Sequence, residues 1–271
     1  MNKNTCFVLC AASFALLASG CSAKKNSPNV IKVAATPVPQ AKMLAEIAPD
    51  LEKQGYTLQV IIMDDYNLPN RALADKEVDA NFFQHIPFLE AQKKQFHYDI
   101  CSLAAIHIEP MGAYSSSIKT IDAVADGAVV AVPSDPSNEA RALLLLQENG
   151  LVTLKENSGY NLTIRDITSN PKKLKILEVD AATLARVLPD VSFAIIPTNF
   201  ALQASLSPSN ALFLEKENSP YVNIIAVRCE DMTEPKLLAL KQAMTSEKMK
   251  EFINKQYGQN VVPAFTPALG K

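Results

Sequence analysis

The chain has 271 residues, of which 48% are hydrophobic and 20% are charged. This length is enough for two lobes of ordinary domain size. The formal net charge of −2 at pH 7 argues against nucleic acid as a partner, because nucleic-acid-binding proteins carry a basic patch or stripe.

The first predicted element is an export signal. Lys3 supplies a positive start, and the apolar stretch over residues 7–17 is too short to span a bilayer about 30 Å thick as a helix. The stretch ends in Leu17-Ala18-Ser19-Gly20-Cys21, which resembles a bacterial lipobox except that Ala18 stands where leucine is more usual. We therefore expect a lipoprotein signal peptide over residues 1–20 and diacylation of Cys21. An ordinary signal peptide with a chance cysteine is the alternative.

Residues 21–28 are polar and are expected to form a flexible tether. Two or more acyl chains hold a protein stably on a membrane surface, whereas one chain holds it only marginally. The expected location is therefore the bacterial cell envelope, with a lipid anchor in a membrane and the folded part facing the periplasm or the exterior.

Short apolar runs alternate with segments of helical periodicity in the rest of the chain. Alternating β and α elements predict a mainly parallel sheet covered by helices. The expected strands are 31–35, 58–63, 100–108 continuing through 111–114, 129–132, 175–179, 193–196 and 222–228. The expected helices are 41–53, 69–75, 86–95, 137–149, 181–187, 234–243 and 246–257.

This pattern is too long for one small sheet, and the chain is expected to cross between lobes near residues 114–117 and 212–221. The predicted fold class is α/β, with two lobes, two crossover strands and a cleft between the lobes. Lobe I is assigned to residues 29–116 plus 221–271, and lobe II to residues 117–220. Two covered sheets joined by two strands form a hinge around a cleft.

Cys101 and Cys229 are the cysteines that remain after the signal and the anchor. Each lies in or beside an apolar, strand-like run, so two buried free thiols are the slightly favoured expectation. Export makes a disulfide between them possible.

Enzyme motifs are missing from the sequence. There is no GxSxG, GxGxxG, Walker loop or HExxH. The histidines His85, His97 and His107 are scattered. We therefore expect a protein that is not an enzyme and needs no cofactor.

The segment Val132-Pro133-Ser134-Asp135-Pro136-Ser137-Asn138-Glu139-Ala140-Arg141 resembles an anion site. Asp135 can cap a helix that starts at a proline, which places Asn138 in the first turn and Arg141 on the same face. The positive helix start and a planar guanidinium could hold a ligand carboxylate at the edge of a parallel sheet. From this segment alone, a capped helix in which Arg141 pairs with a surface acid is the favoured explanation.

Aromatic residues mark a second candidate region. Phe82 and Phe83 lie between polar residues just before a helix, so that one should face the core and the other the cleft, beside His85. Tyr66 and Tyr114 also stand at strand ends, where a position in the core or at the rim is the simpler alternative.

Taken together, four motifs resemble the NlpA/MetQ lipoprotein family, the substrate-binding components of methionine ABC importers. They occur in the family order over essentially the whole mature chain. The motifs are Asp64-Asp65-Tyr66 with Leu68-Pro69-Asn70, Asp79-Ala80-Asn81-Phe82-Phe83-Gln84-His85, the segment from Val132 to Asn138 with Arg141-Ala142-Leu143, and Ser219-Pro220-Tyr221-Val222-Asn223.

The resemblance implies a two-lobed periplasmic-binding-protein fold that binds free methionine, delivers it to the membrane subunits of an ABC transporter and acts as a monomer. Asn138 and Arg141 match the positions that hold the ligand carboxylate. The matched pocket residues are the aromatic Tyr66, Phe83 and Tyr114, together with His85 and Asn223.

The sequence departs from the family at two places. Pro197 stands where relatives usually carry asparagine, so Asn199 is a candidate to compensate, or else caps the next helix. Val38 and Gln40 replace a frequent glycine and histidine. These changes leave a methionine-containing dipeptide or another apolar amino acid open as the ligand.

Other functions also remain open at this point. A metal-capturing lipoprotein could use His85, His107 and Glu109, because imidazole and carboxylate suit Zn²⁺ or Mn²⁺. An enzyme acting in the same cleft and a surface adhesin are further alternatives.

Overall fold

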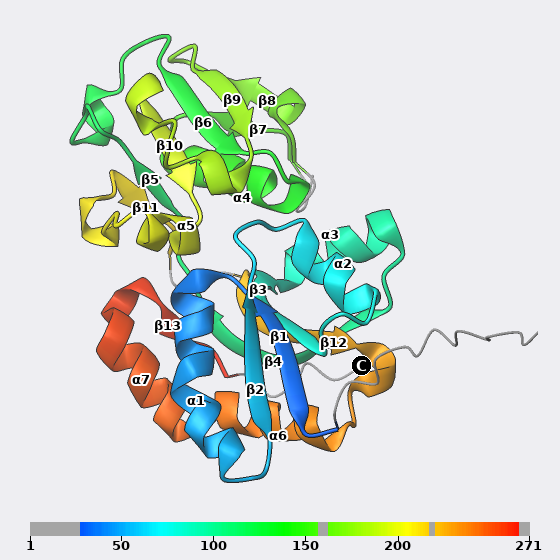
Figure 1. Ribbon diagram of the computed structural model, residues 1–271. Coiled ribbons are helices and arrows are strands. Elements are labelled where there is room, and N and C mark those ends of the chain that lie inside the picture. The colour runs from blue at the N-terminus through cyan, green and yellow to red at the C-terminus, as the bar shows by residue number, and fades with distance from the viewer. Residues whose placement is uncertain (1–27, 157–161, 217–219, 266–271) are drawn as a thin grey trace, which may run out of the picture.

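The computed structural model describes residues 28–156, 162–216 and 220–265, which form two lobes (Figure 1). The predicted signal peptide, the anchor at Cys21 and most of the tether lie outside the described residues. The large lobe is built on a six-stranded sheet of order β13-β4-β12-β3-β1-β2. The small lobe is built on a five-stranded sheet of order β11-β5-β10-β6-β9.

The large lobe takes its elements from both ends of the described chain. Its strands are β1 (Val30–Ala35), β2 (Thr57–Ile62), β3 (Ala80–His85), β4 (Ile100–Ile108), β12 (Val222–Arg228) and β13 (Val262–Pro263). Its helices are α1 (Lys42–Glu52), α2 (Leu68–Ala74), α3 (Ile86–Phe96), α6 (Pro235–Met244) and α7 (Glu247–Tyr257). The short segment η1 (Pro37–Ala41) precedes α1, and the short turns η7 (Cys229–Asp231) and η8 (Gly258–Asn260) flank α6 and α7.

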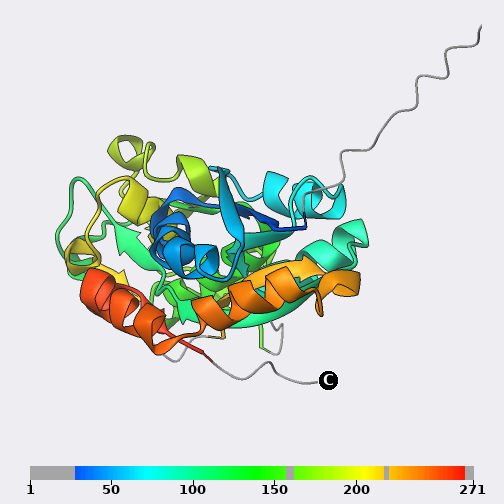
Figure 2. The ribbon, with the colours of Figure 1, turned by 60° about the horizontal axis from the view of Figure 1, so that its bottom comes forward.

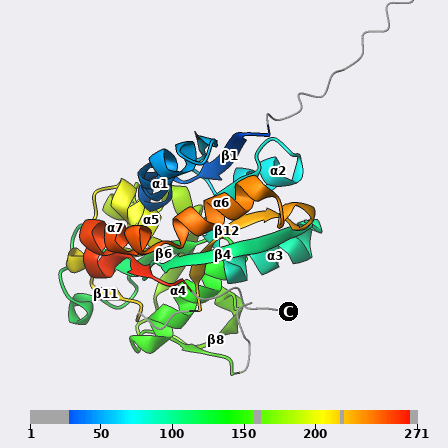
Figure 3. The same ribbon diagram turned by 90° about the horizontal axis from the view of Figure 1, so that it is seen from below.

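Helices cover both faces of the large sheet, so apolar side chains of its inner strands β1 and β12 are buried on both sides. Val33 in β1 points into a core formed with α1, α6 and α7, whereas its neighbour Ala34 points into a core formed with α2 and α3. The same alternation recurs in β12, where Ile225 and Ile224 face opposite cores. Figures 2 and 3 show α6 and α7 following one another along one side of this lobe.

The small lobe is the inserted unit. Its strands are β5 (Gly112–Tyr114), β6 (Val129–Pro133), β9 (Lys175–Val179), β10 (Phe193–Ile196) and β11 (Phe213–Leu214), with a separate pair β7 (Thr153–Leu154) and β8 (Ile167–Ser169). Its helices are α4 (Pro136–Glu148) and α5 (Thr198–Gln203), and its single turns of 3-10 helix are η2 (Ile121–Ala123), η3 (Ile164–Asp166), η4 (Ala181–Thr183), η5 (Leu188–Asp190) and η6 (Pro208–Asn210). Helix α4 covers one face of the sheet, and α5 with the turns around η4 covers the other.

The strand expected to run from 100 to 114 is two strands in two different sheets. β4 pairs with β12 in the large sheet, whereas β5 pairs with β10 and β11 in the small sheet. The first crossing therefore lies at residues 109–111, earlier than the predicted end of lobe I at residue 116. The rest of the division into lobes stays a prediction.

The α-helix predicted over residues 181–187 is wrong. This segment makes a series of i to i+3 turns, such as Leu184 N to Ala181 O and Arg186 N to Thr183 O, and continues into another single turn that contains Pro189. A proline two residues beyond the segment removes a backbone donor and limits any helix to a length that is marginal without strong packing.

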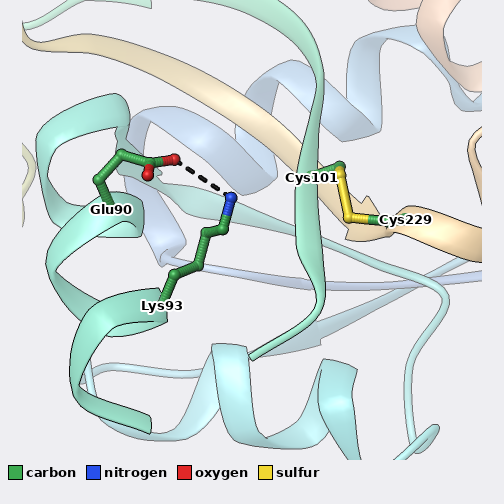
Figure 4. Close-up of a disulfide and its surroundings, with 4 residues drawn as sticks. All are labelled: Glu90, Lys93, Cys101 and Cys229. Carbon is green, nitrogen blue, oxygen red and sulfur yellow. Dashed lines mark hydrogen bonds and ion pairs between the residues drawn. A yellow bond between two sulfur atoms is a disulfide. The ribbon is translucent and has the colours of Figure 1, made fainter. Parts of the chain in front are cut away.

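The expectation of free thiols is also wrong. Cys101 on β4 and Cys229, which directly follows β12, form a disulfide with a Cα–Cα distance of 5.0 Å (Figure 4). The two strands are antiparallel neighbours, with Val227 opposite Cys101. Sheet pairing brings the two cysteines together across 128 positions of sequence, which no spacing rule reveals.

Candidate ligand-binding site

A cavity of about 330 Å³, part of it open to solvent, lies where the two lobes meet. The large lobe and the first crossing contribute Tyr66, Phe83, Gln84, His85, Phe88, Glu109 and Asn223, and the small lobe contributes Asn138, Arg141, Pro197, Thr198 and Asn199.

The start of α4 brings Asn138 and Arg141 to the cavity. Asp135 caps the helix, since its carboxylate accepts the backbone N–H of Asn138 at 3.0 Å, and Pro136 fits the first helical position. Asn138 and Arg141 are three residues apart and so share a face. The positive end of the helix and a buried guanidinium favour an anionic ligand group here.

Arg141 is also held by three protein groups. Nε donates to Glu215 Oε1 at 3.0 Å, and Nη2 donates to Glu215 Oε2 at 2.5 Å. Nη2 also donates to the main-chain oxygen of Glu109 at 2.7 Å. The ring of Tyr221 lies 4.3 Å from Cζ, within cation–π range. Arg141 therefore does pair with an acid, Glu215, and this ion pair lies beside the cavity.

His85 links the lobes as a neutral donor. The backbone N–H of Phe88 donates to His85 Nδ1 at 3.1 Å, so the proton of the neutral ring is on Nε2. Nε2 lies 3.0 Å from Asn138 Oδ1 and donates to it. Burial, reinforced by the nearby Arg141 charge, lowers the pKa of His85 to about 3. The imidazole is therefore uncharged at neutral pH.

Aromatic rings form one wall of the cavity. The ring of Tyr66 lies 5.8 Å from Phe83, 5.6 Å from Phe88 and 4.9 Å from Phe200 between centroids. The Tyr66 hydroxyl donates to Asn199 Oδ1 at 2.6 Å, which is a second hydrogen bond between the lobes. Burial raises the pKa of Tyr66 well above its usual value, so the hydroxyl keeps its proton.

Asn199 is the counterpart of this bond in the small lobe. Its Nδ2 is buried and has no hydrogen-bond partner among the described residues. A buried donor without a partner costs free energy, about 1–3 kcal/mol, which a ligand acceptor would recover. Asn199 therefore offers the cavity one donor whose orientation is fixed by Tyr66.

Glu109 supplies negative charge at the first crossing. Its Oε1 accepts Gln40 Nε2 at 2.7 Å and lies 2.7 Å from His107 Nε2. Thr36 donates in turn to Gln40 at 2.6 Å. The departure from the family pattern at Gln40 therefore falls on the residue that orients this carboxylate.

Seven of the eight predicted ligand-binding residues lie together around the cavity: Tyr66, Phe83, His85, Asn138, Arg141, Asn199 and Asn223. Tyr114 is the eighth predicted residue, and it does not line the cavity. Its ring is buried in the core of the small lobe with Ala131 and Ala194. Its strand β5 lies in the middle of the small sheet, between β10 and β11.

Four residues that line or support the cavity were missed as ligand contacts. Phe88 had a signal in the sequence, since it stands in the first turn of a helix that begins next to His85. Gln84, Thr198 and Glu215 had none, because their roles depend on contacts with residues distant in sequence. For Glu109 the sequence suggests only a role as a metal ligand.

The metal alternative required His85, His107 and Glu109 to converge. His107 and Glu109 are in contact, but both ring nitrogens of His85 are engaged by Phe88 and Asn138. Within residues 28–156, 162–216 and 220–265, no group of three or more His, Cys, Asp or Glu is arranged to hold a metal ion. The metal interpretation is therefore not favoured.

The model of a known family, described as NlpA lipoprotein, matches residues 31–265. The chain belongs to the NlpA lipoprotein family. It is 39% identical over 248 residues to the D-methionine-binding lipoprotein MetQ of Escherichia coli O157:H7, which covers 90% of this chain and 91% of that protein. It is also 39% identical to the methionine-binding lipoprotein MetQ of Bacillus subtilis, over 86% of this chain and 87% of the relative.

Solved structures agree with the NlpA assignment. A nutrient-binding protein from Burkholderia cenocepacia, whose structure is described as bound to methionine, is 46% identical with a TM-score of 0.84. The match covers 87% of this chain and all of that one. The two-lobed fold predicted from the sequence is therefore confirmed for this NlpA family member.

Proposed function

We propose that this chain is a lipid-anchored solute-binding protein that captures free methionine and delivers it to an ABC importer. The names of the relatives support this function, as does the methionine described in the Burkholderia structure. The observation in this molecule that carries the proposal is the combination of opposite charges and an aromatic wall around one cavity.

Each part of a free amino acid finds a complementary group there. The carboxylate faces Arg141 and the unpartnered Nδ2 of Asn199, and the ammonium faces the carboxylate of Glu109. The side chain lies against Tyr66 and Phe83. A thioether gains about 0.3–1.5 kcal/mol from sulfur–aromatic contacts, which favours methionine over an aliphatic side chain of similar length.

Calorimetry with L-methionine, D-methionine and norleucine tests this proposal directly. We expect L-methionine to bind with micromolar to nanomolar affinity, which requires about 8–12 kcal/mol. Mass spectrometry of small molecules released on denaturation should recover the same ligand chemically unchanged, which also counts against an enzyme. Recovery of a dipeptide or of another apolar amino acid would instead indicate that the replacement of the family asparagine by Pro197 accompanies a change of ligand.

The anchor and the partners belong to the same proposal. Diacylation of Cys21 would hold the protein on a membrane, facing the periplasm or the exterior, as a monomer that meets the transporter's membrane subunits. None of the helices in the described ranges is long and apolar enough to cross a membrane. Intact mass of the protein extracted from membranes should show the acyl chains, and Cys21→Ser should abolish them.

A further inference from the structure

Glu215 leaves Arg141 with only part of its hydrogen-bonding capacity. A guanidinium has five N–H donors. Glu215 takes the N–H of Nε and one N–H of Nη2, and the other N–H of Nη2 goes to Glu109 O. Nη1 makes no hydrogen bond to any residue in the described ranges. One nitrogen of Arg141 is therefore left for a ligand in the cavity.

The blocked edge is the one best suited to a carboxylate. Nε and Nη2 together form the planar fork that binds a carboxylate through two parallel hydrogen bonds. In this protein the fork is filled by a carboxylate of the chain itself. A ligand carboxylate can then accept hydrogen bonds only from Nη1. The positive charge of the guanidinium is already balanced by Glu215.

Glu215 is itself fixed in place, so this pairing is part of the site's architecture. Its side chain is 13% exposed and its Oε2 accepts the backbone N–H of Met111 at 3.3 Å. Its own backbone N–H donates to Met111 O at 2.8 Å. Glu215 directly follows β11, in the stretch that leads to the second crossing.

We propose that Glu215 is a specificity-determining residue, which sets how strongly the cavity distinguishes a free carboxylate from an uncharged carbonyl. This inference rests on the proposed function, because it requires an amino acid in the cavity. By occupying the fork and balancing the charge of Arg141, Glu215 lets the site accept amino-acid ligands whose carboxylate is masked as an amide.

The test compares L-methionine with L-methioninamide by calorimetry, at a pH below the pKa of the amide's amino group so that both probes carry an ammonium. The readout is the ratio of the two dissociation constants. In the wild type we expect methioninamide to bind within about tenfold of methionine, whereas an open fork would give a loss of about a hundredfold or more. This comparison uses only the wild-type protein, so it does not depend on whether a variant folds.

Glu215→Gln removes the charge and frees part of the fork with little change in shape. We expect it to raise the preference for methionine by about three- to tenfold, because charge-assisted hydrogen bonds are roughly twice as strong as neutral ones. Glu139→Gln is the matched control. Glu139 is another acid of the small lobe, and it accepts the backbone N–H of Ile164 at 3.0 Å away from the cavity lining.

A ratio that stays unchanged or falls in Glu215→Gln overturns the inference, since it would mean that Glu215 only supports the fold. A wild-type ratio near a hundredfold overturns it as well. If the wild type binds neither probe, the proposed function is wrong and the inference falls with it.

Discussion

Arg141 is the residue on which ligand affinity depends most. Arg141→Ala should weaken methionine binding by about 2–5 kcal/mol, because the ligand carboxylate loses the N–H donors of Nη1 and the carboxylate of Glu215 is left beside the cavity without its charge partner. The same change removes the Arg141 donor from the main-chain oxygen of Glu109, whereas Glu215 keeps only the backbone N–H of Met111. Calorimetry measures the loss, and an unchanged affinity would remove Arg141 from the site.

His85 should make the stability of the protein depend on pH in a defined window. Its pKa is about 3 in the folded protein, whereas the pKa of an ordinary histidine is 6.5, so below pH 6.5 only the unfolded chain takes up the proton. The free energy of unfolding therefore falls as the pH drops from 6.5 toward 3, by roughly 1.4 kcal/mol per unit from this residue. Above pH 6.5 the contribution is constant.

Urea unfolding at a series of pH values tests this dependence. His85→Gln is neutral at every pH and should show a shallower loss between pH 6.5 and 4 than the wild type. His97→Asn, at an exposed histidine, controls for the loss of an imidazole. Equal slopes in the wild type and His85→Gln would mean that His85 is protonated in the folded protein.

Local chemistry explains which site residues could be predicted. Asn138 and Arg141 carry a local signature, since a capping aspartate, a proline and a three-residue spacing all lie within one segment. Glu215 has no such signature, because its contact with Arg141 joins positions 74 apart in sequence. Sequence patterns reveal site residues that lie within one turn of a helix. They miss site residues that are far apart in sequence and come into contact only in the folded protein.

At the scale of elements, β3 shows why a central strand can escape prediction. All six of its residues are buried, yet Asn81, Gln84 and His85 are polar, so neither alternation nor an apolar run marks it. The polar groups are satisfied by contacts outside the strand: Asn81 donates to Asn70 Oδ1 at 2.8 Å, and Asn70 donates to Gln84 Oε1 at 2.9 Å. Most other elements of the large lobe follow simple periodicity and were predicted within a few residues.

The disulfide joins the two strands from which the chain crosses to the small lobe and back. Its closed loop spans 128 positions and contains every strand of the five-stranded sheet. Replacing both Cys101 and Cys229 by serine should lower the free energy of unfolding by about 2–5 kcal/mol, since the unfolded chain regains the entropy of that loop. Denaturant unfolding measures the change, and reduction of the wild type should reproduce it.

Ligand affinity should change little in the same double variant. Cys101 lies six residues before His107 on β4, a separation of about 20 Å along the strand, so the disulfide is far from the cavity. A large loss of methionine affinity with unchanged stability would contradict this account and would place the disulfide in the hinge mechanism instead.

For the whole molecule, the hydrogen bonds between the lobes imply that binding and closure are coupled. Tyr66 to Asn199 and His85 to Asn138 each join the large lobe to the small one at the cavity. A ligand that contacts both lobes stabilises only the closed arrangement, so it shifts the population toward that state. Small-angle scattering should therefore show a smaller radius of gyration with methionine than without it.

Tyr66→Phe isolates one of these contacts, because it keeps the aromatic ring beside the cavity and removes only the hydroxyl that reaches Asn199. Loss of one such bond should favour the open state and weaken methionine binding by about 0.5–1.5 kcal/mol. The variant should also need more methionine to reach the compact form in scattering. Tyr98→Phe, on the large lobe away from the cavity lining, is the matched control. If Tyr66→Phe closes at the same methionine concentration as the wild type, the hydroxyl is not a contact that closure depends on, and the aromatic wall alone accounts for the role of this residue.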